Sequence, residues 1–275
     1  MNDHARFTGA DGEYVVRRWH DGRVAAIVDR VAEEVPIALV YNGLAHVVMM
    51  ASPTDLEDFA LGFSLSEGIV RSANEVNAVE TDAVSDGIAV YVDIDRERFL
   101  PLEAQRRNLT GRTGCGLCGT ETIDQAVRHP PAVGSGVRIT AAALQTAFSN
   151  LSARQPLNAI TGAVHAAAWA LADGQLVSVR EDVGRHNALD KLIGSLARAG
   201  TALEQGFALI TSRASFEMAQ KAATVGITLL AAISAPTGLA IRLAEETGLT
   251  LVGFTRARQH NVYTNPHRIS YPATR

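Results

Sequence analysis

The sequence predicts a protein of the α/β class, α+β overall, in which a smaller N-terminal α+β domain precedes a larger domain with a mostly parallel sheet. Apolar residues alternate in segments before residue 100, which is typical of strands with one buried face. After about residue 136, short continuous apolar runs alternate with helical stretches, as in parallel sheets covered on both faces. HPPAVGSG at 129–136 is rich in Pro and Gly and marks the boundary, so the domains are placed at 1–134 and 135–275.

The first domain contains two predicted strands, a helix and a further strand. The first twenty-odd residues are polar and are expected to form a loose arm. Residues 34–50 predict two strands joined at Asn42-Gly43, because both residues tolerate positive φ. A helix is expected to open at 52–54, where Thr54 and Glu57 have capping-box spacing. Residues 84–94 alternate as a strand, and 106–124 are expected to form an exposed loop.

In the second domain, helical periodicity and apolar runs follow each other. The predicted helices lie at 141–151, 164–171, 184–200, 215–226 and 236–248, and the predicted strands at 176–182, 207–212, 227–234 and 249–254. Ligands of such sheets bind beyond the carboxyl ends of the strands. The residues at those ends are Glu181-Asp182, Ser212-Arg213, Ser234-Ala235-Pro236 and Thr255-Arg256. Hydroxyls, arginines and helix starts together suit an anionic ligand.

Composition narrows the class of protein. The chain has 275 residues, 47% hydrophobic and 20% charged, which is enough for a substantial core. Its formal net charge of −4 gives no general basic field for nucleic acid. The N-terminus lacks the apolar core of a signal peptide, and no apolar run is long enough to span a bilayer. We therefore expect a soluble, cytoplasmic protein without a nucleic-acid or membrane partner.

Cys115 and Cys118 are the only cysteines and lie in GRTGCGLCG, a glycine-rich segment. A zinc site needs about four ligands, so histidines would have to complete it. Zinc deaminases combine a His-x-Glu motif with a later Pro-Cys-x-x-Cys motif. Here two alanines follow His165, so the Glu is missing. The cysteine pair comes before this histidine, and no proline precedes Cys115. A structural metal is therefore not expected.

Three readings of the pair remain open on the residues alone. A thioredoxin-like redox pair favours a helix N-terminus, for which this glycine-rich segment is poorly suited. A turn with two incidental thiols is possible in a chain of this size. A sulfur relay would hold sulfane sulfur as a persulfide, and Arg106, Arg107 and Arg112 would favour the thiolate. The spacing does not choose between redox and relay.

Several longer motifs resemble the FdhD family, the sulfurtransferases that serve formate dehydrogenase. They are GRTGCGLCG, REDVGRHNALDK, TSRASFEMAQKAA, ISAPTGLAIRLAEETGLTLVGFTR and NVYT, in the family order between about residues 35 and 264. The resemblance implies a larger domain similar to cytidine deaminases without their zinc chemistry, and a homodimer. It also implies an enzyme, a sulfurtransferase that takes sulfur from a cysteine desulfurase. The acceptor would be the molybdenum cofactor, Mo-bis(molybdopterin guanine dinucleotide), before that cofactor enters formate dehydrogenase.

The resemblance also assigns site residues. Cys115 matches the persulfide-forming position and Cys118 its partner. The family's cofactor-binding stretch matches Phe254, Thr255, Arg256, Ala257, Arg258 and Gln259. Because this stretch follows an apolar strand, its arginines would lie where a parallel sheet presents phosphates, and the ring of Phe254 could stack on guanine or pterin. The alternative is a basic surface turn.

Other polar residues have a structural and a functional reading. His165 among alanines is expected to be a packing histidine. His186, beside Asp182, Arg185 and Asn187, is expected to contact the ligand, although Asp182 or Asn187 could simply cap a helix. Ser212 and Arg213 stand at a helix start that suits an anion, where Ser212 or Ser215 could instead cap. Asp190 and Lys191 are expected on a solvated face.

Overall fold

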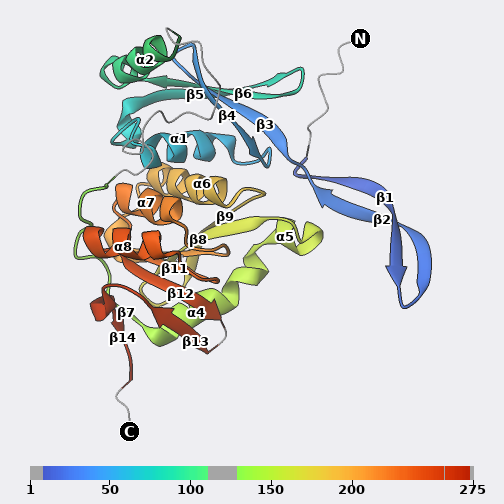
Figure 1. The fold of residues 1–275 in the computed structure, drawn as a ribbon, viewed down its shortest axis with the longest axis vertical. Coiled ribbons are helices and arrows are strands. Elements are labelled where there is room, and N and C mark those ends of the chain that lie inside the picture. Colours follow the sequence, from blue (N-terminus) through green and yellow to red (C-terminus); the bar gives the residue numbers. More distant parts are fainter. Residues whose placement is uncertain (1–8, 111–128, 257, 273–275) are drawn as a thin grey trace.

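A computed structural model describes residues 9–110, 129–256 and 258–272, and it consists of two stacked units with a projecting hairpin (Figure 1). The mixed α+β class predicted from the sequence is confirmed. Among the described residues, no helix is long and apolar enough to cross a bilayer.

The N-terminal unit is built on a four-stranded sheet with the order β4-β3-β6-β5. The strands are β3 (Val35–Tyr41), β4 (Leu44–Ala51), β5 (Val76–Val84) and β6 (Gly87–Ile94), with helices α1 (Leu56–Ser66), η1 (Ala73–Glu75) and α2 (Arg96–Thr110). Alternate residues of β3 are fully buried, as the period of two in the sequence requires. Phe59 and Phe63 of α1 join the same core. The hairpin turn at Asn42-Gly43 is confirmed, since both residues have positive φ.

Three expectations for this unit are wrong. From residue 11 on, the N-terminal segment is ordered as strands: β1 (Asp11–His20) pairs with β2 (Arg23–Ala32) across a turn at Asp21-Gly22, where both residues have positive φ. Thr54 does not cap α1, whose N-cap is Asp55 without a side-chain bond. Residues 106–110 were expected in a loop, but they form the last part of α2.

The C-terminal unit holds a six-stranded sheet with the order β13-β12-β11-β10-β8-β9. The strands are β8 (His165–Leu171), β9 (Leu176–Asp182), β10 (Gly206–Ile210), β11 (Leu229–Ala232), β12 (Thr250–Arg256) and β13 (Gln259–Val262). Only the pairs β10–β11 and β11–β12 are parallel, whereas β8 is antiparallel to β9 and β10, and β13 to β12. The sheet is therefore mixed, which corrects the expectation of a mostly parallel one.

The correction comes from residues 164–171, which were predicted as a helix and instead form β8. Alanine favours helices by well under 1 kcal/mol over most residues, a preference that burial between two strands readily overrides. Residues 166–170 are all buried on β8, which lies between β9 and β10 in the sheet. A tight turn at Gly174 (φ 90°) then sends the chain back along β9, and a Cβ at Gly174 would lie 2.2 Å from the backbone oxygen of Ala143.

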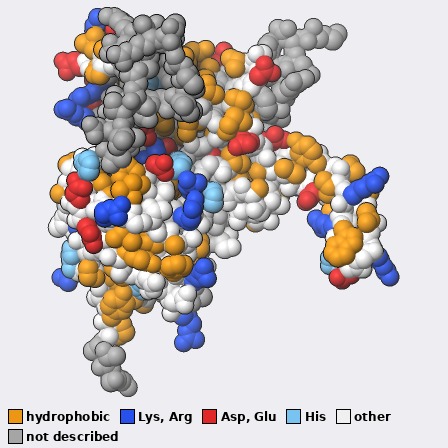
Figure 2. All heavy atoms as spheres, in the orientation of Figure 1, with side chains coloured by type: hydrophobic (Ala, Val, Ile, Leu, Met, Phe, Trp, Pro, Cys, Tyr) orange, Lys and Arg blue, Asp and Glu red, His pale blue; other side chains and the backbone are white. Residues whose placement is uncertain are grey.

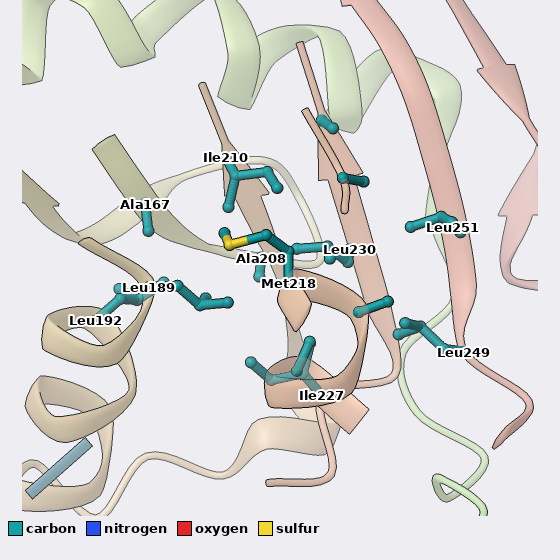
Figure 3. Packing of buried hydrophobic residues seen from close by; sticks show 14 of the residues in the cluster. Ala167, Leu189, Leu192, Ala208, Ile210, Met218, Ile227, Leu230, Leu249 and Leu251 are labelled. Atoms are coloured by element: carbon teal, nitrogen blue, oxygen red, sulfur yellow. The ribbon is translucent and has the colours of Figure 1, made fainter. Parts of the chain in front are cut away.

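Helices cover both faces of this sheet, as predicted. On one face lie α6 (Arg185–Arg198), α7 (Phe216–Thr224) and α8 (Gly238–Thr247), whose apolar residues meet β8, β10, β11 and β12 (Figure 3). On the other lies α4 (Ala141–Leu151). The remaining elements are β7 (Ile139–Thr140), η2 (Ser152–Arg154), α5 (Pro156–Thr161), η3 (Leu203–Gln205), η4 (Pro266–Arg268) and β14 (Ile269–Ser270).

The two units meet where α1 crosses α6. Gly62 and Gly194 allow the close approach: a Cβ at Gly62 would lie 1.7 Å from the oxygen of Asp190, and one at Gly194 would lie 1.9 Å from the oxygen of Asp58. Buried ion pairs surround the crossing, including Lys221 with Asp190 at 2.9 Å. The domain boundaries themselves stay a prediction, but the helix crossing fixes the two units to each other.

Asp190 and Lys191 were expected on a solvated face, and this expectation is wrong. Both side chains are fully buried, and each has an opposite charge within 2.9 Å. Burial lowers the pKa of Lys191, while the carboxylate of Asp182 opposes that shift. Charged residues on a helix are usually solvated, so the sequence alone favoured the wrong face.

Candidate functional site

The carboxyl ends of four strands of the larger sheet share one edge. Since β9 and β10 are each antiparallel to β8, they run in the same direction as β11 and β12. The start of β8 lies at this edge too, with His165 paired to Asp182. The prediction that the polar strand ends share one edge is correct, although it assumed a mostly parallel sheet. It holds in the mixed sheet because β9, β10, β11 and β12 all point the same way.

Asp182 at the end of β9 acts as a structural hub. Its Oδ2 lies 2.7 Å from Nζ of Lys191 and accepts from the backbone N–H of Ser52 at 3.0 Å. Its Oδ1 accepts from the backbone of Gly184 at 2.7 Å and from the amide of Asn187 at 3.0 Å. Every lone-pair direction is used, so Asp182 holds the N-terminal unit against the start of α6 and has no free oxygen for a ligand.

His186 lies on the first turn of α6 beside α7. Its Nε2 is 3.2 Å from Oε2 of Glu217, which also accepts from the hydroxyl of Ser215 at 3.0 Å. Burial and the nearby Arg185 lower the pKa of His186. The imidazole is therefore held in place as a neutral group near neutral pH, which suits hydrogen bonding to a ligand more than charge pairing.

Ser212 and Arg213 follow β10 at the same edge. The hydroxyl of Ser212 is buried and donates to the backbone oxygen of Arg213 at 3.0 Å, so it does not cap α7. The side chain of Arg213 is exposed. Of this pair, only the arginine is placed to meet an anion from solvent.

The loops after β10, β11 and β12 are tied together. The backbone N–H of Thr237 donates to Ala214 at 3.0 Å, and that of Phe254 donates to Ser234 at 3.1 Å. A Cβ at Gly253 would lie 2.8 Å from Cδ of Pro236, so the absence of a side chain there lets the loops touch. These bonds bring the predicted residues at 212–213 and 254–256 into one continuous rim.

Phe254 and Thr255 have unusual local features. Phe254 has φ 51°, a left-handed conformation that bulky residues rarely adopt, and its ring lies 5.9 Å from the guanidinium carbon of Arg256. Thr255 is buried, and its hydroxyl has no hydrogen-bond partner among the described residues. A buried hydroxyl without a partner costs about 1–3 kcal/mol.

The rest of the predicted stretch turns towards the other face of the sheet. Arg258 also has positive φ (68°), and its backbone N–H donates to Oε1 of Gln145 at 3.0 Å. The backbone oxygen of Gln259 accepts from Nε2 of Gln145 at 3.2 Å. Ala257 lies outside the described residues. The stretch is thus anchored by α4 and is not a free surface turn.

His165 and Arg185 form a further polar group that sequence reasoning undervalued. Burial and the charge of Arg185 lower the pKa of His165, with Asp182 opposing. Nε of Arg185 is itself buried and has no hydrogen-bond partner in the part of the chain that the structure describes. No pattern in the sequence marks this group, because residue 165 and residue 185 come together only through the antiparallel pairing of β8 and β9.

Cys115 and Cys118 lie outside the described residues, so their predicted role stays a prediction. Among the residues that are described, no group of three or more His, Asp or Glu side chains is placed to hold a metal ion.

Comparisons with known proteins agree with the motifs. A family model for FdhD/NarQ matches residues 32–270. The chain belongs to the FdhD/NarQ family. It is 54% identical to the sulfur carrier protein FdhD of Cupriavidus necator, covering 95% of this chain and 91% of that protein. It is 56% identical to the protein of the same name from Xanthomonas euvesicatoria pv. vesicatoria, covering 92% and 90%.

A solved structure supports the same fold. The chain is similar, with a TM-score of 0.73 and 25% identity, to a Desulfotalea psychrophila protein assigned as a formate dehydrogenase accessory protein. The match covers 95% of this chain and 100% of that one. Both units and their arrangement therefore belong to the family fold.

Proposed function

We propose that the protein is a sulfur carrier that serves formate dehydrogenase. The observation that carries this proposal is the 54–56% identity, over at least 90% of both chains, to proteins named as sulfur carriers. The chain keeps a Cys-x-x-Cys pair in the motif that carries the resemblance. Membership of the family makes a sulfur relay the preferred reading of that pair over redox chemistry or an incidental turn.

The sulfur step needs only the two thiols. The thiolate of Cys115 attacks the terminal sulfur of a persulfide on a cysteine desulfurase, a new S–S bond forms on Cys115, and the thiolate of the desulfurase leaves. Cys118 then assists by hydrogen bonding to the persulfide. It can also attack the inner sulfur, which releases hydrosulfide and leaves a Cys115–Cys118 disulfide for later reduction.

The acceptor proposed is Mo-bis(molybdopterin guanine dinucleotide), bound as a substrate along the carboxyl edge of the larger sheet. The edge from β9 to β12 crosses four strand intervals, about 19 Å, which fits an elongated ligand with several phosphates. Exposed Arg213 and Arg256 supply charge for phosphates. The ring of Phe254 supplies a stacking face.

The assembly and location follow from the same resemblance. We propose a cytoplasmic homodimer that contacts a cysteine desulfurase and formate dehydrogenase in turn. The net charge of −4 gives no support to a nucleic-acid partner.

The test is persulfide formation on the loop peptide. The full-length protein is incubated with an active cysteine desulfurase and cysteine, digested without reductant, and analysed by mass spectrometry. We expect one added sulfur atom on the peptide that carries Cys115, its removal by a thiol reductant, and its loss in Cys115→Ser but not in Cys118→Ser. A wild-type peptide without added sulfur, beside a desulfurase that sulfurates its own cysteine, would refute the proposal.

Complementation separates the two other functions. A carrier that only binds and inserts the cofactor would support active formate dehydrogenase as Cys115→Ala. A dithiol oxidoreductase would need both cysteines equally and would form the Cys115–Cys118 disulfide without any desulfurase or persulfide. A sulfur carrier predicts that Cys115→Ala is inactive and that Cys118→Ala retains more activity.

The acceptor site is tested with guanosine diphosphate, which carries the guanine and phosphates of the proposed ligand. Arg256→Glu should weaken binding by at least about tenfold, because a guanidinium–phosphate contact is lost and a like charge is added. Arg242→Glu, an exposed arginine on α8 outside the proposed stretch, is the matched control. Equal affinities of the two variants would place the ligand elsewhere.

A further inference from the structure

The β1–β2 hairpin projects from the body as an arm (Figure 1). Its two strands are paired over their whole length, from Asp11 opposite Ala32 to His20 opposite Arg23. The arm carries large hydrophobic side chains that are largely exposed, and Figure 2 shows them among charged ones. Isolated two-stranded ribbons are at best marginally stable in water, so a ribbon of this length is expected to be covered.

The most exposed of the large apolar residues lie on one face of the arm. Directly opposed residues share a face, so Val15 lies with Val28, Arg17 with Ala26, and Trp19 with Val24. The exposed fractions of the large side chains on this face are 80% for Val15, 69% for Trp19, 64% for Val24 and 61% for Val28. We name this set, with Ala26, the apolar arm face; the same face also carries Glu13, Arg17 and Arg30.

The opposite face has less exposed large apolar side chains, at 48% for Tyr14 and 41% for Val31, and its polar groups have partners nearby. Tyr14 donates to Glu33 at 3.2 Å, and Arg18 lies 3.9 Å from Asp29. Ala25 lies on this face opposite Arg18, one residue from Ala26 on the apolar arm face. The two faces therefore differ in what they can bind, although they are built on the same strands.

Charge and area favour a second copy of this chain as the occupant. The arm, 11–32, holds four arginines and four carboxylates, so two arms do not repel each other through net charge. Two ten-residue strands give a face of about 34 by 10 Å, on the order of 340 Å² in outline. A specific interface needs about 800 Å² per partner, so one arm face inserted into an unrelated protein is too small by itself.

A two-fold axis supplies the missing area. If two arms pack with their apolar arm faces together and run antiparallel, the tip of each reaches the base of the other. Exposed apolar side chains lie on elements next to that base: Val48 (63%) and Met50 (46%) on β4, which pairs with the strand that follows the arm, and Ile160 (47%) on α5, which contacts β2. Each copy thus gives and receives the same contacts, as an isologous dimer requires.

We infer that the apolar arm face is the contact through which two copies of this protein pair. This inference rests on the homodimer in the proposed function and names its surface. The arm explains at the same time why an exposed ribbon rich in valine is retained on the protein: it is buried in the assembly.

The test uses the same substitution on adjacent residues of opposite faces. Sedimentation velocity on the full-length protein over a concentration series measures the dissociation constant of the wild type, Ala26→Asp and Ala25→Asp. Both alanines are exposed on β2, so the two variants share any loss of strand propensity. Ala26→Asp should raise the dissociation constant by at least about 100-fold, because symmetry buries its carboxylate twice, whereas Ala25→Asp should stay close to wild type.

Fluorescence gives a second readout. The chain has two tryptophans, of which Trp169 is fully buried in either state and Trp19 is exposed in a single copy. The emission should shift to longer wavelength as the wild type is diluted through its dissociation constant. Val15→Asp is a second variant of the apolar arm face and should behave as Ala26→Asp does.

Three outcomes overturn the inference: a monomeric wild type at tens of micromolar, an Ala26→Asp variant that dimerises normally, or equal loss in Ala25→Asp and Ala26→Asp. The persulfide assay on wild type is independent of all three, so a failure of the arm contact is distinguished from a failure of sulfur transfer.

Discussion

Replacing Gly62 by alanine perturbs the crossing of α1 and α6 with a single methyl group. The Cβ would lie 1.7 Å from the backbone oxygen of Asp190 and 2.6 Å from its carbonyl carbon. Ordinary contact begins at about 3.4 Å, so the helices must separate by about 1.7 Å. Backbone cannot move aside as the end of a flexible side chain can, and the separation is therefore shared by everything that bridges the helices.

The bridging bonds set the magnitude. Ser66 Oγ donates to Asp190 at 2.6 Å, and Arg198 lies 3.0 Å from Asp58, so a separation of this size takes both beyond hydrogen-bond distance. Overpacking costs about 1–3 kcal/mol, and weakened buried charge pairs add to it. Alanine regains about 1 kcal/mol of helix propensity over glycine. We expect the free energy of unfolding to fall by about 2–4 kcal/mol.

The assay is equilibrium unfolding in urea, followed by circular dichroism, with thermal melting as a second measurement. The matched control is Gly134→Ala, where a Cβ meets no atom within 4 Å. Gly134→Ala should unfold within about 0.5 kcal/mol of wild type. If Gly62→Ala unfolds at the same urea concentration as that control, the close helix crossing does not hold the two units together, and the reasoning is refuted.

Three further changes have defined outcomes. Lys191→Met should lower the free energy of unfolding by about 3 kcal/mol in urea, because it leaves the buried carboxylate of Asp182 without its cation; a loss under 1 kcal/mol would contradict this. The pKa of His165 is lowered in the fold, so the unfolded chain binds more protons below about pH 6.5 and the free energy of unfolding of the wild type falls as pH falls. His165→Gln should make the free energy of unfolding depend less on pH in this range. The same pH profile in variant and wild type would contradict this. Thr255→Val should raise the melting temperature by a few degrees, because it removes a buried hydroxyl that has no hydrogen-bond partner among the described residues; a lower melting temperature would contradict this.

Much of the fold followed from local signals. The alternation of apolar residues in β3 and the Asn42-Gly43 turn predicted the hairpin with β4. Both are local signals, since the alternation and the turn conformation depend on neighbouring residues in the chain. Asp21-Gly22 carried the same kind of signal for the arm, but the polar composition around it favoured a loose segment. Pairing between its two strands holds the arm together without a buried core of its own, so composition was a poor guide there.

Other features depended on partners distant in the chain. The alanine-rich segment of β8 has helical propensity, and only its place between β9 and β10 makes it a strand. The sequence indicated a solvated Lys191 because nothing near it in the chain marks its partners. Its carboxylate partner Asp182 lies on another element, and its ammonium group also donates to the backbone oxygen of Ser52 in the N-terminal unit. Charge on a helix indicates exposure unless tertiary structure supplies the opposite charge.

The sequence by itself determined the family, through ordered motifs around Cys115 and along the second domain, and it determined that polar strand ends gather at one edge. Only the tertiary structure decided what each residue at that edge does. It assigned Asp182 to holding the two units together, left the hydroxyl of Thr255 without a partner among the described residues, and anchored Arg258 to Gln145. A motif shows only which residues are present. Burial and hydrogen-bond partners depend on which distant segments pack against those residues.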